Sequence, residues 1–339
     1  MDFQLGVMLR GQYEHGANMA AKADEMIEQA RFADRLGYAS ITKGSHFSTD
    51  AFQAFQQFPV LARLSGEVKR ARLNAGIVLL ALQKPLDMAE QLASIDILSK
   101  GRLIFGVGLG YRDVEFKAFG TDRKERGRRT TENLIAIKRL WSEDKVSMKG
   151  SHFELDEAVC WPKPIQKPHP PIWIGANADV ALKRAAEHGD CWYINPHNTL
   201  ETVARQLDIY RGFLDGAGKP FPQELPMRRE AFVARTREEA LKLAGPFVAK
   251  KYAAYHSWGQ DDDMPPDESL AGGLDAIIGD RFLIGAPDEV AEQMIAINRK
   301  LGVNHLILSM EWAGMEKSVA MDCMQMMAEE VMPRVRQGV

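Results

Sequence analysis

Short apolar runs, bounded by turn residues and too brief to be helices, recur along the whole chain. Eight of them indicate buried parallel strands: FQLGVM from Phe3, YASITKG from Tyr38, RLNAGIVLL from Arg72, LIFGVGLG from Leu103, PIWIGA from Pro171, CWYIN from Cys191, EAFVA from Glu230 and HLILSM from His305. A helical pattern follows each run, with apolar residues spaced by three and four, as in Met26, Ile27, Ala30, Ala33 and Leu36, and in Ala89, Leu92, Ile95 and Leu98. Eight repeats of strand and amphipathic helix predict an α/β fold, a single (β/α)8 TIM barrel over residues 1–339.

A doubly wound open sheet is the alternative architecture. It would be favoured by a GxGxxG motif opening the first helix, but Gly6 is followed by VMLRGQYEHG. Two stretches depart from the repeat and predict insertions after strands 4 and 7. Residues from about 143 to 171 are rich in proline, which disfavours a helix and indicates extended chain across the barrel surface.

The second predicted insertion runs from about 257 to 281. It is acidic and contains Pro265, Pro266, Gly272 and Gly273. Long loops of this kind can serve as lids, so we expect a mobile loop or a lid near the catalytic face. A mobile loop without a function is the alternative.

Composition and charge narrow the range of functions. The 43 Lys and Arg residues nearly balance the 46 Asp and Glu residues, giving a formal net charge of −3, and no basic stripe indicates binding to nucleic acid. The longest apolar run, from Ile77 to Leu82, is far too short to cross a membrane, so we expect a cytoplasmic protein without a membrane partner. Cys160, Cys191 and Cys323 have no CxxC spacing and no nearby histidine array, which predicts buried thiols and no metal site.

Barrel enzymes place their chemistry at the carboxyl ends of the strands, so the residues directly after each run are the candidates. His46 follows the second strand, and its imidazole could donate a proton or a hydrogen bond near neutral pH. A packing histidine is the alternative. After the fifth strand, Gly175, Ala176 and Asn177 precede an Ala-rich helix whose N-terminal N–H groups could bind a phosphate. Asn177 as a plain N-cap explains the same residues.

Glycines in the fourth strand point to a flat ligand. Gly106, Gly108 and Gly110 alternate there and leave one face without side chains, although tight packing is an alternative. The next segment carries four arginines, of which we expect most to lie at a solvated helix start and one to meet an anion: Arg123, Arg126, Arg128 and Arg129. Because nucleophile-elbow, Walker and HExxH motifs are missing from the sequence, a flat phosphate-bearing cofactor explains these features best.

Longer runs are similar to those of a known enzyme family: LSKGRLIFGVGLGYRDVEFKAFG, the Glu125–Arg126 pair with Arg128 and Arg129 behind it, PKPIQKPHPPIWIGA, GDCWYI and FLIGAPDEVAEQM. From the first strand to the last helix, the chain resembles the bacterial luciferase-like flavin-dependent oxidoreductases. The resemblance implies a (β/α)8 barrel that binds reduced FMN, or in one branch a deazaflavin, at the C-terminal face of the barrel. It also implies a homodimer.

The resemblance assigns roles to individual residues. Gly76 and Ile77 would lie against the isoalloxazine, around the place where the family often has a cis non-proline bond, and Gly108 would give the ring room. Arg229 is similar to a family arginine that borders the substrate cavity, and Trp192 is a further candidate for substrate contact. The implied cofactor-binding positions are Gly76, Ile77, Gly108, Arg126, Gly175, Ala176 and Asn177, with the phosphate at the last three.

The segment after the second strand departs from the family pattern. Luciferases carry EHHF there, whereas this chain has Gly44, Ser45, His46 and Phe47, so the first histidine is missing. The deazaflavin branch often has DHF at this place. His46 alone therefore does not separate the two branches.

We predict a two-component monooxygenase in which reduced FMN, supplied by a separate flavin reductase, reacts with oxygen to give a C4a-peroxyflavin. His46 would be the catalytic residue that hydrogen bonds to the peroxide or protonates it, and a small apolar organic molecule would be the substrate. The alternatives are hydride transfer through a deazaflavin and a non-catalytic flavin-binding protein. The expectation of an apolar substrate rests on aromatic residues that can equally belong to the core: Tyr13, Phe47, Phe55, Trp192 and Trp258.

Overall fold

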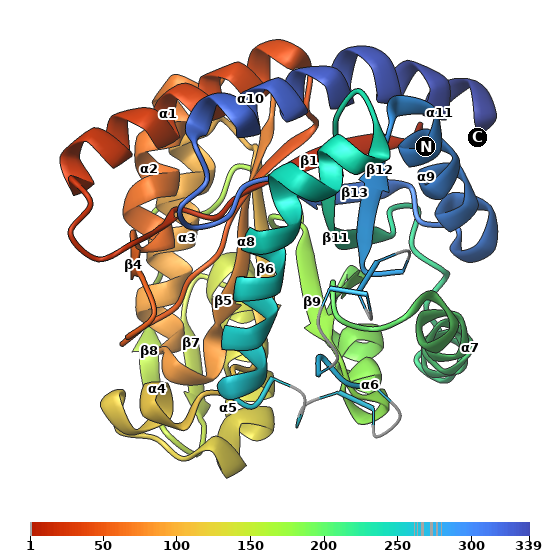
Figure 1. Cartoon of the computed structure of the whole chain (residues 1–339). Coiled ribbons are helices and arrows are strands. Elements are labelled where there is room, and N and C mark those ends of the chain that lie inside the picture. The colour runs from red at the N-terminus through yellow and green to blue at the C-terminus, as the bar shows by residue number, and fades with distance from the viewer. Residues whose placement is uncertain are drawn as a thin grey trace.

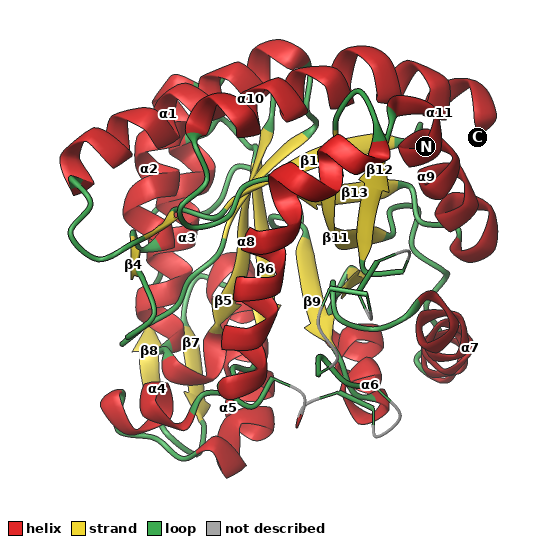
Figure 2. Ribbon diagram, in the orientation of Figure 1, coloured by secondary structure: helices red, strands yellow, loops and turns green. Residues whose placement is uncertain are grey.

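The structure is a computed structural model that describes residues 2–260, 262, 264–265, 268–271, 274–275, 277–278 and 280–339. Its centre is a closed barrel of parallel strands surrounded by helices (Figures 1 and 2). Around the barrel the strands follow in the order β1 (Gln4–Leu9), β3 (Ser40–Lys43), β5 (Arg72–Leu79), β6 (Leu103–Gly108), β9 (Ile172–Ala176), β10 (Cys191–Ile194), β11 (Pro226–Val233) and β13 (His305–Ser309), and β13 pairs with β1. These eight are the strands that the apolar runs predicted, so the TIM barrel is confirmed.

Helices cover the outside of the barrel, and α10 lies against α1 (Figure 1). The helices are α1 (Met19–Leu36), α2 (Gln57–Glu67), α3 (Pro85–Leu98), α4 (Asp113–Ala118), α5 (Arg126–Ser142), α6 (Asp179–His188), α7 (Leu200–Gly216), α8 (Arg237–Ser257), α9 (Pro287–Leu301), α10 (Lys317–Met326) and α11 (Met332–Gly338). Short 3-10 turns lie at Leu80–Leu82 and Arg123–Glu125, and a π-helical turn at Met327–Val331 joins α10 to α11.

Local sequence signals explain where α1 begins and ends. The Asn18 side chain accepts a hydrogen bond from the backbone N–H of Ala21 at 3.2 Å, and Gly37 ends the helix in the left-handed conformation with φ of 87°. Met26, Ala30 and Ala33 are buried against the barrel, as their spacing predicted. The predicted stripe of α3 ends earlier than expected, because Leu98 is 57% exposed.

One strand of the central sheet was missed by the sequence reasoning. β12 (Phe282–Gly285) pairs with the second half of β11, outside the closed barrel, and α9 follows it. β11 can serve both neighbours because its first half, from Pro226 to Glu230, pairs with β13. Its apolar run FLIG is as long as that of β10, so the same hydrophobic signal was present in the sequence.

The two predicted insertions differ in structure. In the first, β7 (Val146–Lys149) and β8 (Glu154–Ala158) form an antiparallel pair, and the proline-rich chain after them contains no helix. In the second, α8 extends to Ser257. The expectation of a lid was based on prolines and glycines that include Pro266, Gly272 and Gly273, and these three lie outside the described residues. A second small antiparallel pair, β2 (Gln12–Tyr13) with β4 (Gln53–Ala54), lies between barrel elements.

The barrel interior is filled at its N-terminal end. Ser40 Oγ and His305 Nε2 are 2.9 Å apart, and His305 Nδ1 lies 2.8 Å from a carboxylate oxygen of Glu224, which closes this end with a polar cluster. Above it lies an apolar layer formed by Met8, Ile104, Trp173, Cys191, Tyr193 and Ile307. Open space is therefore left at the carboxyl ends of the strands, where barrel enzymes carry their sites.

Two further sequence expectations concern cysteines and membranes. Cys160, Cys191 and Cys323 are buried and free, as predicted. In the described part of the chain, no helix combines the length and the apolar character needed to cross a membrane.

Phe105 provides a test of the packing between barrel and helices. It is fully buried on β6, and its ring centroid lies 6.0 Å from that of Trp141 on α5. We expect Phe105→Ala to lower the free energy of unfolding by about 3–5 kcal/mol, because the cavity left behind cannot fully collapse. Urea denaturation measures this loss. Val159→Ala, at a 45% exposed position, is the control with an expected change within about 0.5 kcal/mol, and equal effects of both variants would contradict the packing.

Candidate active site

A cavity of about 950 Å³ opens at the carboxyl ends of the barrel strands. This volume is large enough for a cofactor together with a small substrate. Most of the residues singled out from the sequence line it: His46, Gly76, Ile77, Gly108, Arg126, Gly175, Ala176 and Asn177. The strand-end argument therefore located the cavity.

The ends of β5 and β6 form one wall of the cavity. The peptide bond between Gly76 and Ile77 is cis, as the resemblance implied for this place. A Cβ atom at residue 108 would lie 2.1 Å from Ile77 Cδ1, so Gly108 first makes room for the Ile77 side chain. Gly110 has a φ of 85°, which a residue with a side chain rarely adopts. Local packing and backbone conformation therefore also require glycine at residues 108 and 110. Both residues line the cavity.

A cationic pocket lies where β9 meets α6. Gly175, Ala176 and Asn177 line the cavity directly before the helix, beside Arg126 and Arg184. Arg126 Nη1 donates to the Gly110 carbonyl oxygen at 3.0 Å, and Arg184 Nε donates to Thr131 Oγ1 at 3.0 Å. Burial, followed by the neighbouring charge of Arg126, lowers the pKa of Arg184. Two arginines held this close to one another favour an anion between them.

The N-terminus of α6 lacks the cap that the sequence suggested. The N-cap residue is Ala178, which has no side-chain hydrogen bond, so the interpretation of Asn177 as a plain N-cap is wrong. The Asn177 carbonyl oxygen instead accepts from Gln206 Nε2 at 2.8 Å. The first-turn carboxylate of Asp179 is paired with Arg205 and does not line the cavity. The N–H groups at the start of α6 are therefore without a side-chain cap and next to the two arginines, a donor set that suits a phosphate.

His46 lies in the cavity lining after β3, among aromatic side chains. Its ring lies 5.8 Å from Trp258 and 6.1 Å from Phe52, measured between centroids, and its Nε2 is 3.5 Å from the Tyr255 hydroxyl. Burial, together with the positive charges of Arg112 and Lys43, lowers the pKa of His46 to about 3. The imidazole is consequently neutral at physiological pH.

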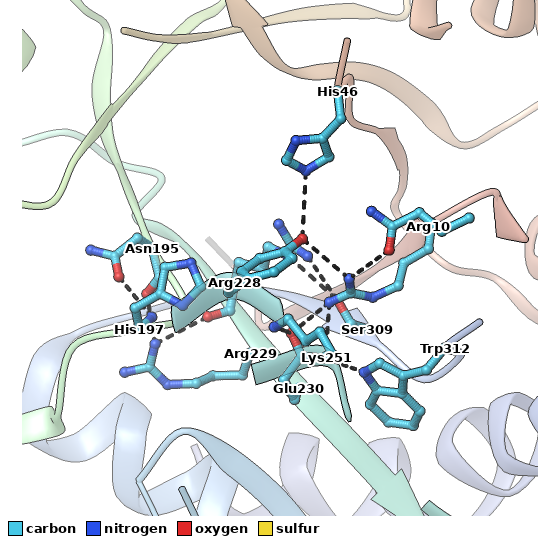
Figure 3. A network of polar contacts seen from close by, with 12 residues as sticks. Arg10, His46, Asn195, His197, Arg228, Arg229, Glu230, Lys251, Ser309 and Trp312 are labelled. Carbon is cyan, nitrogen blue, oxygen red and sulfur yellow. Dashed lines mark hydrogen bonds and ion pairs between the residues drawn. The ribbon is translucent and has the colours of Figure 1, made fainter. Parts of the chain in front are cut away.

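A buried charged cluster supports this side of the cavity (Figure 3). Glu230 accepts hydrogen bonds from Arg10 Nη2 at 2.9 Å, Lys251 Nζ at 2.6 Å and Trp312 Nε1 at 2.8 Å. Burial would raise the pKa of Glu230, but the charges of Arg10 and Lys251 outweigh it and hold the pKa below its usual value. Arg10 also lies 3.5 Å from the Tyr255 hydroxyl, which connects the cluster to His46. The sequence reasoning missed this cluster, because its members are far apart along the chain.

Two predicted substrate contacts lie behind the cavity wall. Arg229 is fully buried and donates to the carbonyl oxygens of Asn195 and Asn198, at 2.7 and 3.0 Å. Trp192 is also fully buried, and its Nε1 donates to the Ala176 carbonyl oxygen at 3.1 Å. Neither belongs to the cavity lining, whereas their chain neighbours Arg228 and Tyr193 do. Successive side chains of a strand point to opposite faces, so in each case the neighbouring residue, and not the predicted one, lines the cavity.

The arginines after β6 differ from the expectation that most of them are solvated, because only Arg128 is exposed and Arg129 is buried. Arg123 and Arg126 line the cavity, whereas Arg128 is exposed and pairs with Glu125 at 2.8 Å. Arg129 Nε donates to the Ala81 carbonyl oxygen at 2.8 Å and holds α5 against the chain after β5. The expectation of an apolar substrate was based on five aromatic residues. None of them belongs to the described cavity lining: Tyr13, Phe47, Phe55, Trp192 and Trp258.

Comparison with known proteins agrees with this architecture. The solved structure of the monooxygenase RslO1 from Streptomyces bottropensis superposes with a TM-score of 0.87 at 25% identity, covering 97% of this chain and 99% of that chain. An F420-dependent glucose-6-phosphate dehydrogenase from Amycolatopsis mediterranei is 25% identical over 344 residues, covering 97% of this chain and 99% of that protein.

Two similar proteins are named as flavin-dependent monooxygenases. The oxygenase component of a flavin-dependent trigonelline monooxygenase from Acinetobacter baylyi is 28% identical over 277 residues, 80% of this chain and 74% of that protein. An FMNH2-dependent dimethylsulfone monooxygenase from Pseudomonas putida is 30% identical over 241 residues, 66% of this chain and 65% of that protein. Residues 2–305 match the model of the luciferase-like monooxygenases. The chain therefore belongs to the luciferase-like monooxygenase family and is an oxidoreductase of that family.

Proposed function

We propose that this protein is the oxygenase component of a two-component monooxygenase, which takes reduced FMN from a separate flavin reductase and oxidises a small organic substrate with oxygen. The observation that carries the proposal is the uncapped N-terminus of α6 beside Arg126 and Arg184, at the mouth of a cavity of about 950 Å³. Two similar monooxygenases support a flavin cofactor, since one is named as flavin-dependent and the other as FMNH2-dependent. The proposal includes a homodimer, which rests on the family resemblance.

Protein side chains and backbone would hold the cofactor at two places. Arg126, Arg184 and the start of α6 fit the phosphate, and the ends of β5 and β6 at Gly76, Ile77 and Gly108 fit the ring. Bound reduced flavin supplies the two electrons with which oxygen is activated. The protein would contribute orientation, charge and exclusion of water.

His46 would act as a neutral hydrogen-bonding group in this site. With a pKa of about 3 it carries no proton to donate as an imidazolium at pH 7, so the expected role as a general acid is not favoured. Its Nε2 and the Tyr255 hydroxyl, 3.5 Å apart, can orient each other toward the cavity.

The end of α8 would keep water from this side of the cavity. Tyr255 and Gln260 line the cavity, and the Tyr255 ring stacks on Trp258 with 5.5 Å between centroids. The Arg112 guanidinium lies 4.6 Å from the Trp258 ring, which ties α8 to the segment before α4.

Anaerobic titration followed by oxygen tests the proposed function. We expect reduced FMN to bind more tightly than oxidised FMN, and the complex to consume oxygen when mixed with aerated buffer, as measured with an oxygen electrode. A deazaflavin serves as the comparison, because an F420-dependent relative is similar over the whole chain. Binding of F420 without binding of FMN, and without oxygen consumption, would instead favour hydride transfer.

Arg184→Gln tests the phosphate position. The substitution should weaken FMN binding roughly 10- to 100-fold, because a hydrogen bond to a charged group contributes about 1.5–3 kcal/mol. Riboflavin, which lacks the phosphate, should bind equally to both proteins in the same calorimetric titration. Arg128→Gln is the matched control, since Arg128 is exposed and outside the lining. A similar loss for riboflavin would place the phosphate elsewhere.

The pH dependence of stability tests the neutral state of His46. Its pKa is near 6.5 in the unfolded chain and about 3 in the folded one. The unfolded state therefore binds the extra proton between these values, and stability falls as the pH decreases from 7.5 to 5.0. We expect His46→Gln to lose about 1–2 kcal/mol less than wild type over this interval in urea denaturation. An equal loss in both proteins would mean that His46 titrates normally.

A further inference from the structure

Arg228 brings a positive charge into the cavity without a carboxylate in direct contact among the described residues, although its charge helps to lower the pKa of Glu230. It lies on β11 and lines the cavity (Figure 3). Its Nε and Nη2 reach Ser309 Oγ at 3.4 and 3.3 Å, long distances for hydrogen bonds. Within the described residues, no carboxylate lies at ion-pair distance from this guanidinium. A guanidinium has five N–H donors, and the only side-chain hydrogen-bond acceptor of Arg228 among the described residues is Ser309 Oγ.

Lys43 adds a second positive charge without an acidic partner among the described residues. Its side chain is deeply buried, and its Nζ donates to the carbonyl oxygens of Arg10 and Gly44, at 3.3 and 3.0 Å. Burial lowers the pKa of Lys43 to about 8, so the amine is still mostly protonated at pH 7. Glu230 forms its ion pairs with Arg10 and Lys251, and not with Arg228 or Lys43.

Two further titratable groups of the cavity lining do not neutralise these cations. The Nδ1 of His197, which lines the cavity, has no hydrogen-bond partner among the described residues, and burial lowers the pKa of His197 well below its usual value. Glu115 lines the cavity too, but it accepts hydrogen bonds from the Phe47 N–H and from Arg112. Buried unpaired charge is costly, so a bound anion would relieve the electrostatic penalty here.

The topology places Arg228 opposite the wall assigned to the flavin ring. In the closed barrel, β11 is four strands from β5 in either direction, and β13, which carries Ser309, is four strands from β6. Gly76 and Gly108 lie on β5 and β6. A ring against those strands would leave space between itself and Arg228, and Met8, Ile77 and Tyr193 supply apolar surface around that space.

We infer that the substrate is a small organic carboxylate, whose carboxylate group binds Arg228 while Lys43 adds positive charge from β3. This inference rests on the proposed function, because it assigns the other side of the cavity to the flavin ring. It replaces the expectation of an apolar substrate. Arg228 is the residue that determines specificity for charge, since a guanidinium pairs with a carboxylate through two parallel hydrogen bonds.

Paired carboxylates and amides test the inference on the protein saturated with FMN. Benzoate with benzamide, and hexanoate with hexanamide, match in shape and differ in charge. We expect isothermal titration to give at least one carboxylate that binds ten-fold or more tightly than its amide. In Arg228→Gln this preference should disappear while FMN affinity stays unchanged, and Arg228→Lys should restore part of it. Arg128→Gln is the control and should retain the full preference.

Three results would overturn the inference: equal binding of each pair, no carboxylate binding to the FMN complex, or a loss of FMN affinity instead of carboxylate affinity in Arg228→Gln. The last result would assign the guanidinium to the cofactor. Circular dichroism spectra of the variants verify that they fold. Failure of the proposed function is distinct, because FMN itself would then not bind in the first titration. The carboxylate titrations on protein without FMN would still test Arg228.

Discussion

The alternation of side chains along closed parallel strands decides what this barrel can do. Every second residue points inward, and the inward positions at the N-terminal end are filled by the His305 cluster and by the apolar layer around Trp173. Space for a ligand remains at the carboxyl ends of the strands. The same alternation sends Arg228 into the cavity and Arg229 behind it, so a shift of one residue separates a ligand contact from a structural residue.

Charge is distributed unevenly around the space that this rule leaves. Arg126 and Arg184 lie at the α6 side, where the start of a helix adds its own partial positive charge. Arg228 and Lys43 lie toward the β11 and β3 sides. Glu230 neutralises Arg10 and Lys251 and is not itself part of the lining. The cavity therefore offers two separate cationic regions, one suited to a phosphate and one to a substrate anion.

The sequence predicted the features that depend on neighbours along the chain. The eight strands, the position of His46 after β3 and the segment from Gly175 to Asn177 follow from local hydrophobicity and from the strand-end rule. It could not predict features that arise when distant segments meet. Glu230, for example, contacts residues from the chain after β1, from α8 and from the chain after β13. The sequence also allowed a better prediction of which side chains point into the cavity. Successive residues of a strand point to opposite faces, so Tyr193 and Arg228 were the alternatives to Trp192 and Arg229.

The neutral state of His46 and the unpaired cations have the same electrostatic origin. Arg112, Lys43, Arg10 and Arg228 all disfavour a proton on His46, after burial itself. An anion bound at Arg228 would offset part of this positive field, so the pKa of His46 would rise when the substrate binds. Substrate charge and the protonation of His46 are thus coupled through the cavity. A neutral substrate would leave the pKa of His46 unchanged. The charge of the substrate would therefore help to determine whether His46 donates or accepts hydrogen bonds in the cavity.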